Sequence, residues 1–229
     1  VRYNWGKLQR QDSARLAVAV ADAEWDNLEV VLNRWQEAFG MPISEVETPQ
    51  IYALLVNAIA TVDPMRVEPK AFYHRQRPFE RYEDTMPSHE EPFLRGEGSY
   101  PSGHSLRGWL IGLVLAQVAP ERAEAIYARS WDYCNSRVIV GAHWQSDVDA
   151  ARLAASVAYA KLHTSERFLE QMAKARKEFQ EKKNGGTNGV KAVAEEPRNA
   201  VNGRAYTIMG TPATSQDRGI IIQDNQKLG

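Results

Sequence analysis

Apolar residues recur at intervals of three and four over most of this chain, and that spacing constrains the fold more than any other feature. It is clear in residues 16–39, 51–62 and 168–179, and it returns in the Ala-rich stretch 150–158. Residues three and four apart share one face of a helix, so each stretch is predicted to be a helix with one buried face. The chain is therefore predicted to be all-α, a single-domain helical bundle.

Caps and prolines set the expected helix boundaries. Thr48 before Pro49 is typical of a helix start, and the residue before Pro78 is disfavoured in a helix. The predicted helices are residues 13–39 (one long or one broken helix), 49–62, 70–76, 103–118, 120–136, 144–163 and 166–182. Residues 137–143 are β-branched and contain glycine, so an extended link and a continued helix both stay open.

Three segments lack a sustained helical period. Residues 1–12 are polar and predicted to be an arm that needs a surface to pack on. Residues 79–99, rich in Glu, Pro and Gly, are predicted to be a long loop that covers a site. Residues 183–229 are predicted to be an irregular Gly/Asn-rich C-terminal extension, with candidate strands at 205–209 and 219–222. It could pack on its own body or on a partner subunit, and we favour the partner.

Composition excludes several classes of function. With 229 residues, 43% of them hydrophobic, the chain can build one substantial core. Its net charge of -1 gives no global basic field, so nucleic acid is not expected as a partner. No run reaches the roughly 18 to 20 apolar residues that cross a bilayer, so no membrane span is expected. Cys134 is the only cysteine and is interpreted as a buried thiol.

Residues 100–110 place the sequence Ser-Gly-His where a polar loop gives way to an apolar helix. A helix entry presents unpaired N–H groups and the positive end of the helix dipole, which together attract anions. Ser102 adds a hydroxyl there and His104 adds an imidazole. We predict that a phosphate binds at this turn, although Ser-Gly-His alone also fits a helix cap with a satisfied histidine.

Two further residue pairs have spacings that suit a phosphate site. Lys70 and Arg77 are seven residues apart, nearly two turns of helix, which would put both cations on one face about 10 Å apart. His143 and Asp147 are four residues apart, so the carboxylate can accept a hydrogen bond from one imidazole nitrogen. The other nitrogen then keeps its lone pair and can act as a nucleophile or a metal ligand.

In combination these motifs resemble a known family. The chain has the three-part signature of the phosphatidic acid phosphatase type 2 and vanadium haloperoxidase superfamily: Lys70-(six residues)-Arg77-Pro78, Pro101-Ser102-Gly103-His104 and Ser136-Arg137-(five residues)-His143-(three residues)-Asp147. The flanking sequences Arg-Gln-Arg-Pro-Phe and Gly-Ala-His-Trp-Gln-Ser-Asp resemble those of the bacterial class A non-specific acid phosphatases. The resemblance spans roughly residues 13–180, with Ser105 where that class commonly has threonine.

The resemblance implies a helical acid phosphatase domain over residues 1–182, with 183–229 as an added extension. It implies that His143 attacks phosphorus to form a phosphohistidine, that Asp147 orients His143, and that His104 protonates the leaving alkoxide and later activates water. The groups expected to hold the phosphoryl oxygens are Lys70, Arg77, Ser102, Gly103 and Arg137. Because three cations neutralise the charge, neither a metal ion nor a cofactor is expected.

The expected substrates are phosphate monoesters, including nucleotides, sugar phosphates and aryl phosphates, with phosphotransfer to other hydroxyls as a side activity. The resemblance also implies inhibition by vanadate, a homodimer or higher homo-oligomer, and a periplasmic or secreted location; a first residue Val1 fits a processed chain. Two alternatives stay open: a vanadium-dependent haloperoxidase with vanadate at His143, and a helical phosphate-binding module without turnover. A membrane lipid phosphatase is disfavoured because no span is found in the sequence.

Overall fold

The computed structural model of the chain describes residues 2–185 and the backbone of residues 205–207 and 221–223. The chain divides into two units, residues 1–186 and 187–229. The sequence-predicted boundary after residue 182 falls inside the last helix, which continues to Gly185. Within the second unit, strands β1 (Ala205–Thr207) and β2 (Ile221–Gln223) pair antiparallel, close to the two predicted strands. The predicted packing of this extension on a partner falls outside the described residues.

The first unit is all-α, as predicted. Its helices are α1 (Arg2–Gln9), α2 (Ser13–Ala21), α3 (Leu28–Leu32), α4 (Gln36–Phe39), α5 (Pro49–Val62), α6 (Val67–Tyr73), α7 (Pro78–Arg81), α8 (Glu91–Leu94), α9 (Gly103–Val118), α10 (Ala123–Ile139), α11 (Gln145–Leu162) and α12 (Glu166–Gly185), with 3-10 turns at Asn33–Trp35, Asp63–Arg66 and Pro120–Arg122. Among the described residues, no helix is long and apolar enough to cross a bilayer.

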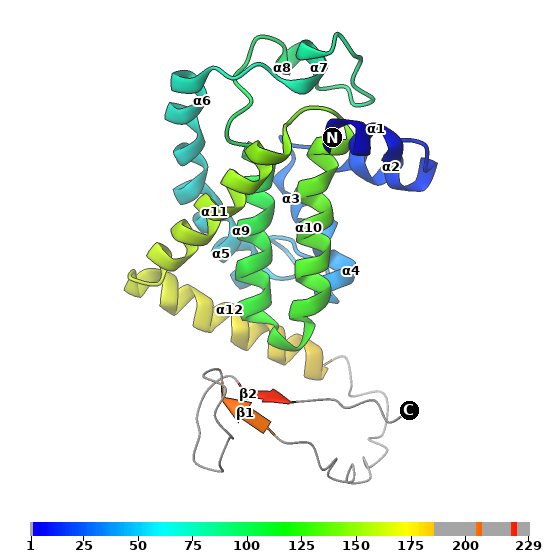
Figure 1. Ribbon diagram of the computed structural model, residues 1–229. Coiled ribbons are helices and arrows are strands. Elements are labelled where there is room, and N and C mark those ends of the chain that lie inside the picture. Colours follow the sequence, from blue (N-terminus) through cyan, green and yellow to red (C-terminus); the bar gives the residue numbers. More distant parts are fainter. Residues whose placement is uncertain (1, 186–204, 208–220, 224–229) are drawn as a thin grey trace. The chain divides into compact units, whose positions relative to one another are not determined.

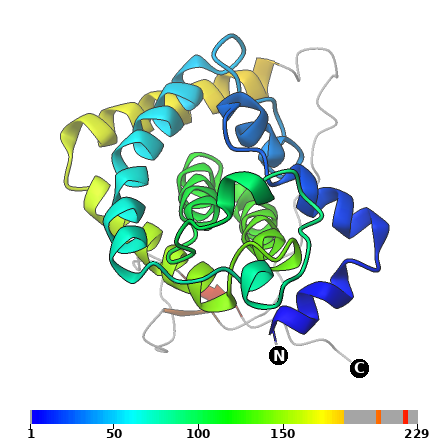
Figure 2. The same ribbon diagram turned by 90° about the horizontal axis from the view of Figure 1, so that it is seen from above.

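Helices α9 and α10 form the centre of this unit, and the other helices surround them (Figure 2). Helix α9 packs against α10 and α11, while α5 packs against α12. Helices α7 and α8 lie at one end of the central pair, and α12 crosses near the other end (Figure 1). The bundle therefore has one end closed by a long helix and one end covered by short helices and loops.

Glycines set the distance between the two central helices. A Cβ at Gly112 would lie 2.1 Å from Ser130 Oγ, and a Cβ at Gly108 would lie 2.3 Å from the ring of Tyr133. Ser130 is itself fixed because its hydroxyl accepts a hydrogen bond of 2.8 Å from Trp35 Nε1. No larger residue fits at these two positions unless α9 and α10 move apart.

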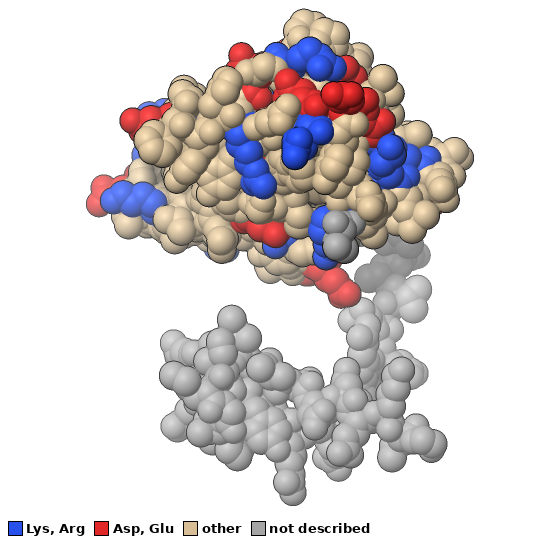
Figure 3. Space-filling model, turned by 45° about the horizontal axis from the view of Figure 1, so that its top comes forward, with Lys and Arg blue, Asp and Glu red and all other residues tan. Residues whose placement is uncertain are grey.

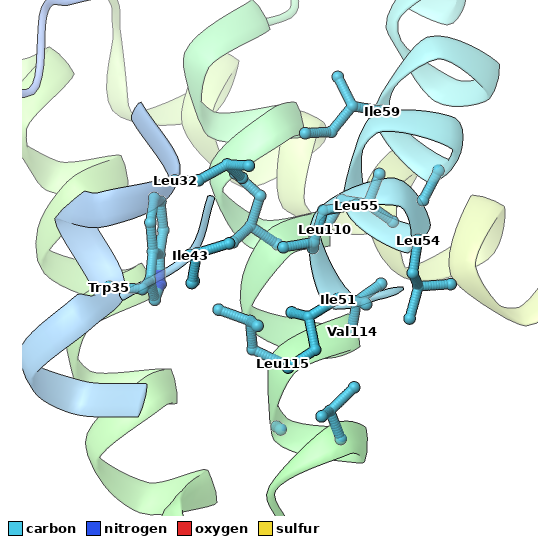
Figure 4. Packing of buried hydrophobic residues seen from close by; sticks show 14 of the residues in the cluster. Leu32, Trp35, Ile43, Ile51, Leu54, Leu55, Ile59, Leu110, Val114 and Leu115 are labelled. Atoms are coloured by element: carbon cyan, nitrogen blue, oxygen red, sulfur yellow. The ribbon is translucent and has the colours of Figure 1, made fainter. Parts of the chain in front are cut away.

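The main core fills the space between α3–α5, α9 and α12. Each buried aliphatic or aromatic side chain there contributes about 1.5–3 kcal/mol through removal of apolar surface from water. The residues at its centre are Leu32, Trp35, Ile43, Ile51, Leu54, Leu55, Ile59, Leu110, Val114 and Leu115 (Figure 4). These residues come from the apolar faces predicted for residues 13–39, 49–62 and 103–118, and from Ile43 in the loop after α4.

Two segments without a helical period are more ordered than the sequence suggests. Residues 2–9 form helix α1, which packs on α10 so closely that a Cβ at Gly6 would lie 2.5 Å from the Val138 carbonyl oxygen. The predicted arm therefore belongs to the bundle. The predicted loop at 79–99 contains helix α8 and most of helix α7, each only four residues long. Single turns of this length leave no periodicity that a sequence pattern can reveal.

Backbone turns decide the helix boundaries that the sequence left undecided, and they shorten one predicted helix. Residues 13–39 form a broken helix, interrupted between α2 and α3. Residues 137–143 continue α10 to Ile139 and then turn at Gly141, whose φ of +83° is left-handed. The helix predicted at 70–76 ends earlier, at Tyr73, because His74 adopts a left-handed conformation with φ +39°.

Candidate active site

A cavity of 380 Å³ opens at the end of the bundle where α6, α7 and α8 lie. Acidic and basic side chains lie beside one another on this face of the first unit (Figure 3). Five of the predicted site residues line the cavity: Lys70, Arg77, Gly103, His104 and His143. The other three, Ser102, Arg137 and Asp147, are each fully buried and do not line the cavity.

A second hollow in the first unit is larger but lacks such groups. It is an open groove of 670 Å³ whose walls include Arg34 and Gly40. Its buried carboxylate, Asp22, forms an ion pair with the partly exposed Arg129. We therefore take the smaller cavity as the candidate active site.

The start of α9 is joined to the start of α11. The Ser102 hydroxyl accepts a hydrogen bond of 3.2 Å from the Ser105 N–H, as an N-cap residue does. The Ser102 N–H donates to the main-chain carbonyl of Asp147 at 3.1 Å. The predicted anion turn is thus joined to the main chain of Asp147, the acidic residue of the predicted histidine pair.

Lys70 and Arg77 reach the cavity by a different route from the one predicted. They do not share a helix, because α6 ends at Tyr73 and Arg77 is extended, with φ -75° and ψ 155°, just before α7. The two side chains are instead brought together by the Gly98 carbonyl. This carbonyl accepts hydrogen bonds from Lys70 Nζ at 2.8 Å and from Arg77 Nη2 at 3.2 Å. The prediction of two neighbouring cations stands, but the two-turn helical step is wrong.

The cations in this cluster perturb one another. Burial, followed by the positive charges of Arg77 and Arg66, lowers the pKa of Lys70 from 10.5 to about 7. Burial and the charge of Arg137 lower the pKa of Arg77 to about 10. Both pKa values fall in part because cations lie close together here, and such a cluster of cations favours binding of an anion.

The turn after α10 places His143 beside Arg77. The His143 N–H donates to the Arg137 carbonyl at 3.2 Å, so the left-handed turn at Gly141 brings this histidine back over the last turn of the helix. His143 Nε2 lies 3.2 Å from Arg77 Nη1, an arrangement that suits an unprotonated nitrogen facing a donor. Burial first, and then the charge of Arg77, lowers the pKa of His143 well below its ordinary value.

Asp147 lies behind His143 and is held by other groups. His143 Nδ1 is 3.5 Å from Asp147 Oδ2, which also accepts a hydrogen bond of 2.9 Å from the Trp144 N–H. The second carboxylate oxygen accepts a hydrogen bond of 2.7 Å from Arg75 Nη1. Burial nevertheless raises the pKa of Asp147, and the Trp144 N–H and the charge of Arg75 oppose that rise.

His104 also lines the cavity. Its Nε2 is 3.1 Å from the Ala23 carbonyl oxygen, and its ring packs on Trp25 with a centroid distance of 4.7 Å. Burial, and then the charge of Arg137, lowers the pKa of His104 well below its ordinary value. A neutral imidazole is thus favoured unless a negative group comes near it.

Arg137 is fully buried in the last turn of α10. Its Nη2 donates to both carboxylate oxygens of Glu90, at 2.7 and 2.9 Å. Its Nε and Nη1 have no hydrogen-bond partner within the described part of the chain. Buried donors are seldom left without acceptors, so this guanidinium has capacity for a ligand.

Sequence reasoning missed three contributors to the site. Trp25 lies between α2 and α3 and packs on His104, Arg75 binds Asp147, and Glu90 binds Arg137. Arg75 stands inside the Arg-Gln-Arg-Pro-Phe sequence, which was a usable signal. Glu90 lies within the predicted loop 79–99, where a carboxylate gives no sign of burial until the fold is known.

The first unit is thus a helical bundle in which two histidines and three cations lie in or near one cavity. The chain belongs to the PAP2 superfamily, whose family model matches residues 49–167. That range contains all eight predicted site residues. The resemblance inferred from the sequence motifs is thereby confirmed.

Characterised relatives carry acid phosphatase names. The chain is 44% identical over 151 residues to a non-specific acid phosphatase of Providencia stuartii, covering 65% of this chain and 61% of that protein. It is 38% identical over 174 residues to a non-specific acid phosphatase of Salmonella typhimurium, covering 75% and 69% of the two chains. An acid phosphatase of Zymomonas mobilis is 35% identical over 173 residues, covering 75% and 65%. The chain thus aligns with about two thirds of each relative's length.

Proposed function

We propose that this chain is an acid phosphatase that hydrolyses phosphate monoesters through a phosphohistidine at His143. The observation that carries this proposal is Arg137, a fully buried guanidinium with two unpaired nitrogens beside the cavity. A buried donor without an acceptor costs about 1–3 kcal/mol, which a phosphoryl oxygen would recover. The acid phosphatase names of the relatives support the same conclusion.

The lowered pKa values of Lys70 and Arg77 also support a phosphoryl ligand. Both values fall partly because cations lie close together around the cavity. A phosphate ester places negative charge where these cations meet and removes that mutual repulsion. Phosphoryl transfer depends mainly on positioning and on charge neutralisation, both of which this cluster supplies.

In the first step His143 Nε2 attacks phosphorus while the bond to the ester oxygen breaks. His104 gives its proton to that oxygen, and the alcohol leaves. In the second step a water molecule attacks the phosphohistidine, His104 accepts the water proton, and inorganic phosphate is released with His143 restored. Asp147 holds His143 by its Nδ1 side throughout, at the 3.5 Å separation seen here.

The substrate range follows from the same pocket in this proposal. Nucleotides, sugar phosphates and aryl phosphates share the phosphoryl group that the cavity would bind, and a hydroxyl in place of water would give phosphotransfer. Vanadate should inhibit because it adopts the five-coordinate geometry of the transition state. Metal independence, a dimeric or higher assembly and a periplasmic or secreted location stay predictions from the family resemblance.

The decisive experiment measures phosphate release from an aryl phosphate across acidic to neutral pH, for the wild-type chain and for His143→Ala. We expect turnover by the wild-type chain only, and phosphate bound to the protein during turnover that is released by acid and stable in base, as a phosphohistidine requires. Near-normal rates in His143→Ala would show that another group is the nucleophile. Phosphate binding without release at any pH would identify a binding module, and bromide oxidation by the vanadate-loaded protein with peroxide would identify a haloperoxidase.

A further inference from the structure

Glu90 places a carboxylate inside a cluster of positive charges. It directly precedes α8, is 7% exposed, and lines the same cavity as His104 and His143. A carboxylate is rarely buried to this extent unless it is paired. Here it accepts two hydrogen bonds from Arg137 Nη2, at 2.7 and 2.9 Å, and one of 3.0 Å from the Ser88 hydroxyl.

Glu90 also faces the histidine predicted to be the general acid. Its Oε1 is 3.7 Å from His104 Nε2, the same nitrogen that lies 3.1 Å from the Ala23 carbonyl oxygen. Both of these contacts are with oxygen acceptors, so His104 Nε2 is placed to carry a proton. Of these two acceptors, only the Glu90 carboxylate carries a negative charge; the Ala23 carbonyl is neutral.

Three other charged or titratable groups near His104 disfavour its protonation. They come from α10, from the turn after it and from α9 itself, and they are Arg137, His143 and Arg107. Arg66, Lys70 and Arg77 add positive charge on the walls of the same cavity, which Glu24, Asp26 and His89 also line. The rings of Trp25 and Tyr133 lie 4.7 and 6.4 Å from the His104 ring by centroid distance and carry no charge.

We propose that Glu90 is a positioning residue of the active site that stabilises protonated His104 and holds Arg137 in place. This inference rests on the proposed phosphatase function. By holding Nη2, the carboxylate leaves Arg137 Nε and Nη1 available for phosphoryl oxygens. By facing Nε2, it stabilises the imidazolium of His104, which supplies the proton that a poor leaving group needs.

The proton balance of this arrangement is simple. When the P–O bond breaks, the His104 proton goes to the leaving oxygen and the imidazole becomes neutral. Burial favours that neutral form, so protonated His104 is a strong acid that the carboxylate keeps available. Glu90 itself neither gains nor loses a proton in the step.

The test compares Glu90→Gln with a neighbouring control, Glu91→Gln. Glu91 pairs with Arg95 at the surface and does not line the cavity, so its variant should behave as wild type. Glutamine at 90 keeps one oxygen for Arg137, removes the charge and replaces the second oxygen with an NH₂ group. Each protein is assayed with glycerol phosphate, which has a poor leaving group, and with p-nitrophenyl phosphate, which has a good one, over the full pH profile.

For Glu90→Gln we expect kcat on glycerol phosphate to fall about 10-fold or more, while kcat on p-nitrophenyl phosphate changes less than about 3-fold. The basic limb of the glycerol phosphate profile should move to lower pH by about one unit, because the nearby opposite charge is gone. Inorganic phosphate, measured by calorimetry, should bind at least as tightly as to wild type, since one repulsive charge has been removed.

Equal losses on both esters, or a pH profile that does not move, would overturn the inference and leave Glu90 a structural residue. Should Glu90→Gln fail to fold, Ser88→Ala serves as a second variant, because it removes only the hydroxyl that donates to Glu90. It should show the same difference between esters with a smaller amplitude, and no difference would again count against Glu90. A wild-type chain that hydrolyses neither ester would instead refute the proposed function.

Discussion

Lys70 offers a direct test of the charge arrangement, because its pKa is lowered to about 7 from an ordinary 10.5. Burial is the largest cause, followed by the charges of Arg77 and Arg66. Between pH 7 and 10.5 the unfolded chain therefore binds more protons than the folded chain, so folding stability should rise with pH across that window. Below pH 7 Lys70 is charged in both states, and the destabilisation from burying its charge is present in full.

A bound anion should reverse this shift, because an opposite charge favours the protonated amine. Sulfate is the appropriate probe, since its own charge of about -2 does not change in this range. An ion pair at about 4 Å is worth about 4 kcal/mol at an effective dielectric constant of 20, close to a thousandfold in affinity. Loss of one proton should therefore weaken sulfate binding about tenfold for each pH unit above pH 7.

The assay is sulfate titration by calorimetry at several pH values from 7 to 9, with the wild-type chain and Lys70→Arg. Arginine stays protonated throughout, so its affinity should be independent of pH over that range. A wild-type affinity that stays constant would refute the lowered pKa of Lys70. An equal decline in Lys70→Arg would show that a different group titrates.

Three further predictions concern single residues. His104→Ala should reduce turnover of glycerol phosphate about 100-fold and leave p-nitrophenyl phosphate much less affected, and equal losses would argue against an acid role. Gly112→Ala should destabilise the bundle by about 1–3 kcal/mol in urea unfolding through its clash with Ser130, and a change within about 0.5 kcal/mol would contradict that packing. Glu178→Ala should cost about 0.5–2 kcal/mol by removing the acceptor for the Gln50 N–H, and Glu178→Gln, which keeps an oxygen, should lose less.

The helical framework was predictable because its signals are local. Residues 49–62 and 103–118 begin and end where their caps, prolines and apolar periods indicated. For α5, however, the sequence predicted the position of the N-cap residue but not the groups that bind the first N–H groups of the helix. Thr48 occupies the N-cap position, but its hydroxyl lies near the Pro42 and Ser44 carbonyls, and the first N–H groups of α5 are bound by the Glu178 carboxylate. A partner 128 residues away leaves no trace in the local sequence.

The sequence predicted which residues form the site better than it predicted how they are arranged. The residue types and spacings of the three motifs pointed to one phosphate pocket, and the chain does bring Lys70, Arg77, His104 and His143 to one cavity. The helical argument for Lys70 and Arg77 failed because the left-handed residue His74 ends α6 early. Contacts made across the fold decide such a turn, and a periodicity argument does not include them.

The cations of the cavity are oriented largely by main-chain atoms. Lys70 donates to the Gly98 carbonyl, and Arg77 donates to the carbonyls of Glu97, Gly98 and Ala142. Most side chains at those positions can change without loss of the acceptor, because every residue carries a carbonyl. Comparison of related sequences would therefore overlook these partners, and random mutagenesis would rarely find them. Gly98 is the exception, since a Cβ there would lie 2.5 Å from the Lys70 carbonyl oxygen.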